Sequence, residues 1–248
     1  MINRRRGIYI LPNLLTTAAL FAGYYSIVAA MNAHYEAAAI AIFVAMILDG
    51  MDGRIARLTN TQTDFGVEYD SLSDMVSFGL APALVVYQWS LESMGKLGWL
   101  ASFIFAATAA LRLARFNTQA TSADKQFFQG LPSPAAAAVI AGMIWFAEFQ
   151  GLTDGTGILF ISFPLTVIVG ILMVSNIRYH SFKQFDLKGR VPFITVLIIV
   201  LVFVFIASEP PLVVFLISVL YAASGPVMTL FLIRKRRAER KIQESVRE

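Results

Sequence analysis

The chain has 248 residues, of which 57% are hydrophobic and 15% charged, and its mean hydropathy is +0.67. A soluble domain of this size needs more charged surface, so the composition indicates a protein of the lipid bilayer. The absence of cysteine excludes disulfides and thiolate metal sites, and His34 and His180 lie too far apart for a histidine-rich site, so any metal here would be held by oxygen.

A helix that crosses a membrane needs roughly 20 mostly apolar residues. We expect about eight such helices, in chain order at 11–32, 33–56, 68–91, 97–116, 132–150, 157–178, 191–208 and 210–233. Asn3–Arg6 precedes the first of them as in a secretory signal, but no small-residue cleavage site follows, so we expect a retained helix. No repeat or linker divides the chain, and residues 1–248 are predicted to form one all-α, polytopic transmembrane helical bundle.

The basic residues predict the orientation of this bundle. With the N-terminus inside, only Lys96 of the twenty Lys and Arg residues falls in an outer loop. Cytoplasmic loops of membrane proteins carry this excess of cations, so we expect both termini in the cytoplasm and no nucleic-acid partner. The basic tail, residues 234–248, is interpreted mainly as a solvated flank of the last helix, with gathering of anionic lipid as the alternative.

Four aspartates lie at the predicted inner ends of the second and third helices: Asp49, Asp52, Asp70 and Asp74. A spacing of three places the first two on one helix face, and a spacing of four places the other two on one face. Because the helices are antiparallel and joined by a short loop, we expect the two faces to meet. An Asp deep in a membrane helix costs about 2.5–3.5 kcal/mol on insertion scales, so these carboxylates require a positive partner.

Divalent cations would supply that partner, because hard cations prefer carboxylate oxygens and Mg²⁺ is often held by a few carboxylates plus substrate phosphate. Two ions bridged by carboxylates would clamp a phosphoryl group and leave one carboxylate able to act as a base. Gly53, Ala56 and Gly66 leave the helix faces bare for a diphosphate or nucleotide, although small residues also serve close helix packing. A cation-coupled transporter is the alternative, but transporters hold carboxylates near the midplane, beside broken helices and within repeats.

The spacing Asp49-x2-Asp52-Gly53-x2-Ala56-Arg57-x8-Gly66-x3-Asp70-x3-Asp74 matches every fixed position of the signature of the CDP-alcohol phosphotransferases, and the chain resembles that family. This signature covers residues 49–74. Finer similarity to the phosphatidylserine synthase branch of the family lies in residues 64–83, 111–117 and 128–134, and Leu11–Thr16 is widespread in the larger family.

The resemblance implies an enzyme that transfers a phosphatidyl group from CDP-diacylglycerol to L-serine and releases CMP, with Mg²⁺ or Mn²⁺ as cofactor, two ions per active site. It implies Asp49, Asp52 and Asp70 as metal ligands, with Asp74 at the metals as the base that deprotonates the acceptor hydroxyl. The nucleotide-binding residues that it implies are Asp52, Gly53, Ala56, Arg57, Gly66, Thr63, Asn13 and Thr16. It also implies a homodimer in the cytoplasmic membrane, with the active site at the cytoplasmic face.

The acceptor pocket is less closely specified. Serine carries a carboxylate that Arg112 and Arg115 could grip through paired hydrogen bonds, but both also fit as anchors at the inner end of the fourth helix, and Arg115 fits a phosphate contact. Residues 128–134 fit either the start of a helix or part of this pocket. Another acceptor (glycerol 3-phosphate, inositol phosphate or choline) stays open, as does the choice between direct displacement and a covalent phosphatidyl-enzyme intermediate.

Overall fold

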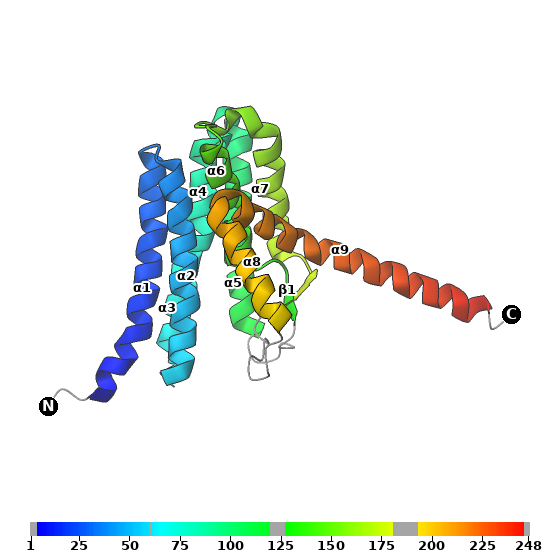
Figure 1. Cartoon of the computed structure of the whole chain (residues 1–248), viewed down its shortest axis with the longest axis horizontal. Coiled ribbons are helices and arrows are strands. Elements are labelled where there is room, and N and C mark those ends of the chain that lie inside the picture. The colour runs from blue at the N-terminus through cyan, green and yellow to red at the C-terminus, as the bar shows by residue number, and fades with distance from the viewer. Residues whose placement is uncertain (1–3, 60, 120–126, 181–192, 246–248) are drawn as a thin grey trace.

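The computed structural model describes residues 4–59, 61–119, 127–180 and 193–245 of the chain (Figure 1). Its α-helices, in chain order, are α1 (Arg4–Met31), α2 (Tyr35–Thr59), α3 (Asp64–Asp74), α4 (Ala81–Trp89), α5 (Lys96–Gln119), α6 (Ser133–Phe149), α7 (Leu159–Val174), α8 (Phe193–Ser208) and α9 (Pro210–Ser245). Shorter elements are the π-helical η1 (Met75–Leu80), the 3₁₀-helical η2 (Leu91–Met94) and η3 (Gly155–Ile158), and the strands β1 (Phe127–Gln129) and β2 (Arg178–His180).

Four segments of the described chain are long and apolar enough to cross a membrane: Leu11–Met31, Lys96–Thr118, Gly155–Val174 and Pro210–Phe231. The protein is therefore an integral membrane protein of mostly helical structure. The expected count of about eight spans is not confirmed. The helices α6 and α8 have only 17 and 16 residues, and α2 and α3 carry the aspartates.

A small strand pair departs from the purely helical prediction. Strands β1 and β2 are antiparallel, with Phe128 opposite Tyr179. The predicted helix start at residues 128–134 is correct only from Ser133 onward, because the chain first leaves β1 through Gly130 at φ 77°. A Cβ on Gly130 would overlap the carbonyl of Met173, so this turn against the end of α7 requires glycine.

The third predicted span is one continuous helical segment made of α3, η1 and α4. Its middle is widened: the N–H of Ala81 bonds to the carbonyl of Val76, five residues back, as in a π-helix. Single π turns inside α-helices occur frequently at functional sites. Here the widened turn begins directly after Asp74. The helical pitch therefore changes immediately beyond the last of the four aspartates.

Helix α1 packs closely against two other elements, α2 and the widened turn η1. It runs beside α2 (Figure 1), whose buried face is formed largely by Ala38, Ala41 and Ala45. It also lies against η1, where Ser77 Oγ donates to the carbonyl of Ala19 at 3.1 Å. A Cβ on Gly23 would lie only 2.7 Å from the Cα of Ser77, so glycine permits this close approach.

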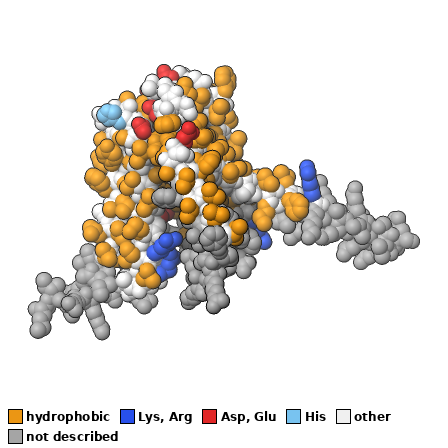
Figure 2. All heavy atoms as spheres, in the orientation of Figure 1, with side chains coloured by type: hydrophobic (Ala, Val, Ile, Leu, Met, Phe, Trp, Pro, Cys, Tyr) orange, Lys and Arg blue, Asp and Glu red, His pale blue; other side chains and the backbone are white. Residues whose placement is uncertain are grey.

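Apolar side chains cover much of the visible flank of the bundle (Figure 2), as a lipid-facing surface requires. In that view the visible Asp and Glu side chains lie mainly near the upper end of the bundle. Most of the visible Lys and Arg side chains lie toward the other end. The face seen in Figure 2 therefore combines an apolar flank with acidic side chains near one end and basic side chains toward the other.

We expect Gly23→Ala to lower the free energy of unfolding by about 1–3 kcal/mol, because the new methyl group forces α1 away from η1. Gly50→Ala is the matched control, since Gly50 is also helical and a Cβ there meets nothing within 4 Å. Thermal unfolding of the purified protein in detergent, followed by circular dichroism, measures both. Equal melting temperatures for the two variants would contradict the close packing of α1 on η1.

Candidate active site

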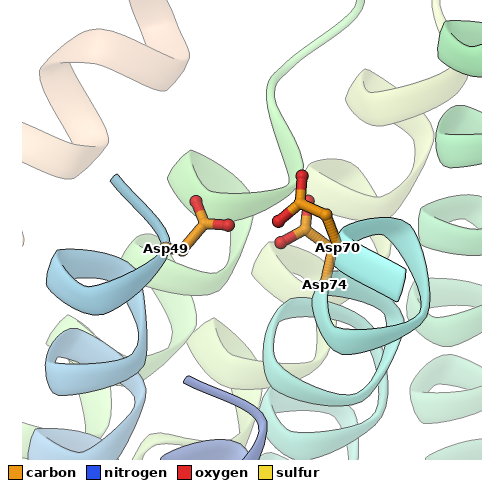
Figure 3. Close-up of side chains that lie close together, drawn as sticks. All are labelled: Asp49, Asp70 and Asp74. Atoms are coloured by element: carbon orange, nitrogen blue, oxygen red, sulfur yellow. The ribbon is translucent and has the colours of Figure 1, made fainter. Parts of the chain in front are cut away.

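Three carboxylates converge between α2 and α3 (Figure 3). Asp49 projects from α2, and Asp70 and Asp74 project from α3 one turn apart. One oxygen of each lies within 4.8 Å of the others. Each of the three is partly buried, and Oδ1 of Asp70 is buried without a hydrogen-bond partner among the described residues. A set of carboxylate oxygens with one buried, unsatisfied acceptor fits a hard divalent cation.

Asp52 is not one of this group of three, although it lies near enough to interact with the charges of Asp49 and Asp70. Its side chain is only 4% exposed, and its Oδ2 accepts a hydrogen bond from Thr16 Oγ1 of α1 at 2.6 Å. The sequence prediction that all four aspartates lie together is thus confirmed for three of them. The sequence gives no sign that the fourth binds a hydroxyl on α1, because Thr16 and Asp52 are 36 residues apart.

The first turn of α3 brings three of the predicted nucleotide-binding residues together. Thr63 caps the helix in an extended conformation, and its Oγ1 accepts the N–H of Gly66 at 3.0 Å. A Cβ on Gly66 would lie 3.1 Å from Thr63 Oγ1 and 3.6 Å from Asn13 Oδ1. Asn13, Thr63 and Gly66 therefore border one small region, which a side chain at position 66 would crowd.

Three more of the predicted nucleotide-binding residues, Gly53, Ala56 and Arg57, lie on the last two turns of α2. Thr16, which was also predicted to contact the nucleotide, lies on α1 and bonds to Asp52. A Cβ built on Gly53 meets only Nη2 of Arg57, at 4.0 Å. Gly53 and Ala56 are partly buried, whereas Arg57 is exposed. This part of α2 is therefore an open surface with a cation at its edge, one turn beyond the converging carboxylates.

Arg112 of α5 is the basic residue that the structure brings to the carboxylates. It is 9% exposed, Nη1 donates to Ser133 Oγ at 2.8 Å, and Nε is buried without a partner among the described residues. Asp74 and Tyr221 lie close enough to interact with its charge. A buried guanidinium requires compensation, and Asp74 supplies part of it. Ser133 at the start of α6 is a contact that the sequence prediction missed.

Arg115 has a different environment, although the sequence treats it like Arg112. It is partly buried, and Nη1 donates to the carbonyl of Val174, the last residue of α7, at 3.2 Å. A cation at the C-terminal end of a helix satisfies a carbonyl that has no partner within the helix. The structure thus ties Arg115 to α7 and leaves Arg112 facing the carboxylates.

Two polar contacts around α3 were also missed. Asn117 Nδ2 donates to Ser71 Oγ at 3.0 Å, which links α5 to α3. Thr17 Oγ1 and Tyr69 Oη lie 2.8 Å apart, which links α1 to α3. The only available signal was that Ser71 and Asn117 both lie in segments that resemble the phosphatidylserine synthase branch.

Comparison with known proteins decides the family. Residues 9–174 match the family described as CDP-alcohol phosphatidyltransferase. The chain belongs to this family. It is 39% identical over 229 residues to the CDP-diacylglycerol–serine O-phosphatidyltransferase of Helicobacter pylori, which covers 92% of this chain and 94% of the relative. It is also 40% identical over 181 residues to the protein of that name from Mycobacterium tuberculosis, covering 70% of this chain and 62% of the relative.

An archaeal relative carries a different name. The chain is 33% identical over 171 residues to the archaetidylserine synthase of Methanothermobacter thermautotrophicus, covering 68% of this chain and 69% of the relative. The CDP-alcohol phosphatidyltransferase family is generally dependent on divalent metal, in keeping with the three converging carboxylates. The matched region, 9–174, contains those carboxylates and ends with α7.

We expect Thr16→Val to lower the free energy of unfolding by about 1.5–3 kcal/mol, because it removes the hydroxyl that donates to the buried carboxylate of Asp52. Thr16→Ser keeps a hydroxyl at this position and should lose less than half as much. Thermal unfolding in detergent compares the two variants. If Thr16→Val melts at the same temperature as Thr16→Ser, the bond to Asp52 does not contribute to stability.

Proposed function

We propose that this chain is a phosphatidylserine synthase, which transfers the phosphatidyl group of CDP-diacylglycerol to the hydroxyl of L-serine and releases CMP. The observation that carries the proposal is the convergence of Asp49 with Asp70 and Asp74 within 4.8 Å. It occurs in a chain 39% identical, over 229 residues, to a relative with that printed activity. Phosphoryl-group transfer needs mainly positioning and charge neutralisation, and a convergent carboxylate site provides both.

Asp49, Asp70 and Asp74 would hold the divalent cations, Mg²⁺ or Mn²⁺, with two ions in each site. Asp52, one turn from Asp49 on α2, would complete the set, with Thr16 fixing its carboxylate. Bound cations would neutralise the diphosphate of the donor lipid and draw charge from the departing CMP. Support comes from the all-oxygen donor set and from the buried, unsatisfied Oδ1 of Asp70.

Asp74 is the residue that we assign as the base. It would accept the proton of the serine hydroxyl while the hydroxyl oxygen forms a bond to the phosphatidyl phosphorus, and the bond from phosphorus to CMP breaks. This is a direct displacement, without a covalent phosphatidyl-enzyme intermediate. The widened turn η1 begins directly after Asp74, and Asp74 interacts with the charge of Arg112. The base thus lies beside the arginine that suits the acceptor.

The cytidine nucleotide would lie over the open surface of α2 and the start of α3. Gly53, Ala56 and Gly66 would allow it to approach the helix backbones, and Arg57 would orient its phosphates. Asn13 and Thr63 border Gly66 and would contact the nucleotide at its edge. These contacts would leave the diphosphate above the carboxylates and the reactive phosphorus between them and Asp74.

Arg112 would bind the carboxylate of serine. Its Nη1 is held by Ser133, and its buried Nε has no partner among the described residues, so a donor is left for a planar anion. Arg115 would support α7 through the carbonyl of Val174 instead. Residues 128–134 would contribute to the acceptor pocket through Ser133.

The membrane arrangement is also part of the proposal. Eight spans with both termini in the cytoplasm would leave only Lys96 of the twenty cations outside. The active site would then open at the cytoplasmic face, where serine and CMP are dissolved and the donor lipid arrives laterally. The functional unit would be a homodimer.

The decisive assay is CMP release by purified protein with CDP-diacylglycerol and each of several alcohols, with and without Mg²⁺ or Mn²⁺. We expect release that requires serine and metal, and a loss of at least about 100-fold in kcat for Asp74→Asn, because the variant lacks the base. Release with glycerol 3-phosphate, inositol phosphate or choline would keep the chemistry and change the acceptor. No release from folded protein would favour a cation-coupled transporter.

The role of Arg112 makes a separate prediction. Arg112→Gln should raise the KM for serine about tenfold or more, because a hydrogen bond between two charged groups is lost. Ethanolamine has no carboxylate, so the preference for serine over ethanolamine should fall with it. Arg115→Gln is the matched control and should keep that preference. An unchanged preference in Arg112→Gln would assign the serine carboxylate to another residue.

A further inference from the structure

A groove of about 440 Å³ follows one stripe of α9, beyond the region 9–174 that matches the family. Its apolar wall includes Ile217, Leu220 and Met228, which recur along one face of the helix, and Arg178 of β2 borders it. The volume lies in the range of ordinary ligand pockets, roughly 300–1,000 Å³. The groove thus combines a long apolar wall with a cation.

Tyr179 holds α9 against β2 and so shapes the groove. The Tyr179 side chain is 0% exposed, its hydroxyl donates to the carbonyl of Ala222 at 2.9 Å, and burial raises the pKa of Tyr179 to about 12. The phenol therefore stays protonated and keeps donating. A Cβ on Gly225 would lie within 2.8 Å of the Tyr179 ring, so glycine lets the ring seat against α9. Arg178, the residue before Tyr179 on β2, lies at the border of the groove.

Tyr221 relates the groove electrostatically to the active site. Tyr221 lines the groove, and its ring lies 5.8 Å from the ring of Tyr179. It also interacts with the charge of Arg112, which in turn interacts with that of Asp74. A ligand in the groove would therefore lie against Tyr221, a residue whose hydroxyl is close enough to Arg112 to interact with its charge. A lipid that merely surrounds the protein needs no such connection.

We propose that this groove receives an acyl chain of the CDP-activated donor lipid, with Arg178 at its border favouring an anionic lipid. The inference deepens the proposed function and rests on it. Serine and CMP are too polar for a wall of Ile217, Leu220 and Met228, whereas an anionic lipid matches both the wall and the cation. In a bilayer an acyl chain gains little by leaving one apolar phase for another, so the groove must select by packing.

Chain length supplies the test. We expect Leu220→Trp to raise the KM for dioleoyl CDP-diacylglycerol about tenfold by filling the groove. With dihexanoyl CDP-diacylglycerol the KM should stay within about twofold, because the short chain does not reach the filled part. Leu230→Trp is the matched control, since Leu230 is also an exposed residue of α9 but does not line the groove. Equal effects on both donors, or in both variants, would overturn the inference.

A labelling experiment tests occupancy without turnover. The chain has no cysteine, so Ser224→Cys places a single thiol in the groove, and Ala223→Cys places one beside it. Dioleoyl CDP-diacylglycerol should slow N-ethylmaleimide labelling of Ser224→Cys at least about fivefold and leave Ala223→Cys unchanged. Equal protection by dioleoyl phosphatidylglycerol would show a site for bulk lipid and overturn the assignment to the donor.

The two proposals fail in distinguishable ways. If the wild-type protein releases no CMP with serine and either donor, the synthase assignment fails, and with it the donor as the lipid in the groove. If the wild-type protein is active but Leu220→Trp does not discriminate between long and short donors, only the groove assignment fails. Variants are compared after their folding has been checked by thermal unfolding.

Discussion

Carboxylates that lie within 4.8 Å of one another repel, and the fold has to hold them together across two helices. Helix α1 supplies the restraint through Thr16, which contacts both α2 and α3. The hydroxyl of Thr16 donates to Asp52 of α2, while its carbonyl accepts from Ser73 of α3 at 3.2 Å. One buried residue thus binds the two helices whose aspartates face each other. Gly23 of α1 lies close to Ser77, so the packing of α1 on this segment extends into η1.

Arg112 completes this arrangement from the other side. A guanidinium that is 9% exposed needs a negative neighbour, and Asp74, next to η1, provides it. The interaction between the two charges offsets part of the free-energy cost of burying each of them. Ser133 fixes one end of the guanidinium and so selects its direction. The same contacts that stabilise the buried arginine therefore leave it ready to bind an anion beside the carboxylates.

The spacing of the aspartates was enough to predict that α2 and α3 face each other, because helix geometry fixes which residues share a face. The capping of α3 by Thr63 is equally local, because a threonine directly before a helix bonds to an N–H group of the helix's first turn. Contacts that depend on distant helices could not be predicted. Asp52 turns to a threonine 36 residues away, and Arg112 and Arg115, alike in sequence, differ because α6 and α7 approach them at different points. The π turn η1 has no distinctive sequence pattern.

The last part of the chain adds a second kind of surface to the family core. The region that matches the family ends with α7, and the polar chemistry of the carboxylates lies entirely within it. Tyr179 and Gly225 then hold α9 close to β2, and Tyr221 of α9 lies near enough to Arg112 to interact with its charge. A membrane enzyme that joins a lipid to a water-soluble alcohol must hold both at one phosphorus atom. A polar core with an apolar groove at its edge meets that requirement, and Tyr221 lines the groove while interacting with the charge of Arg112.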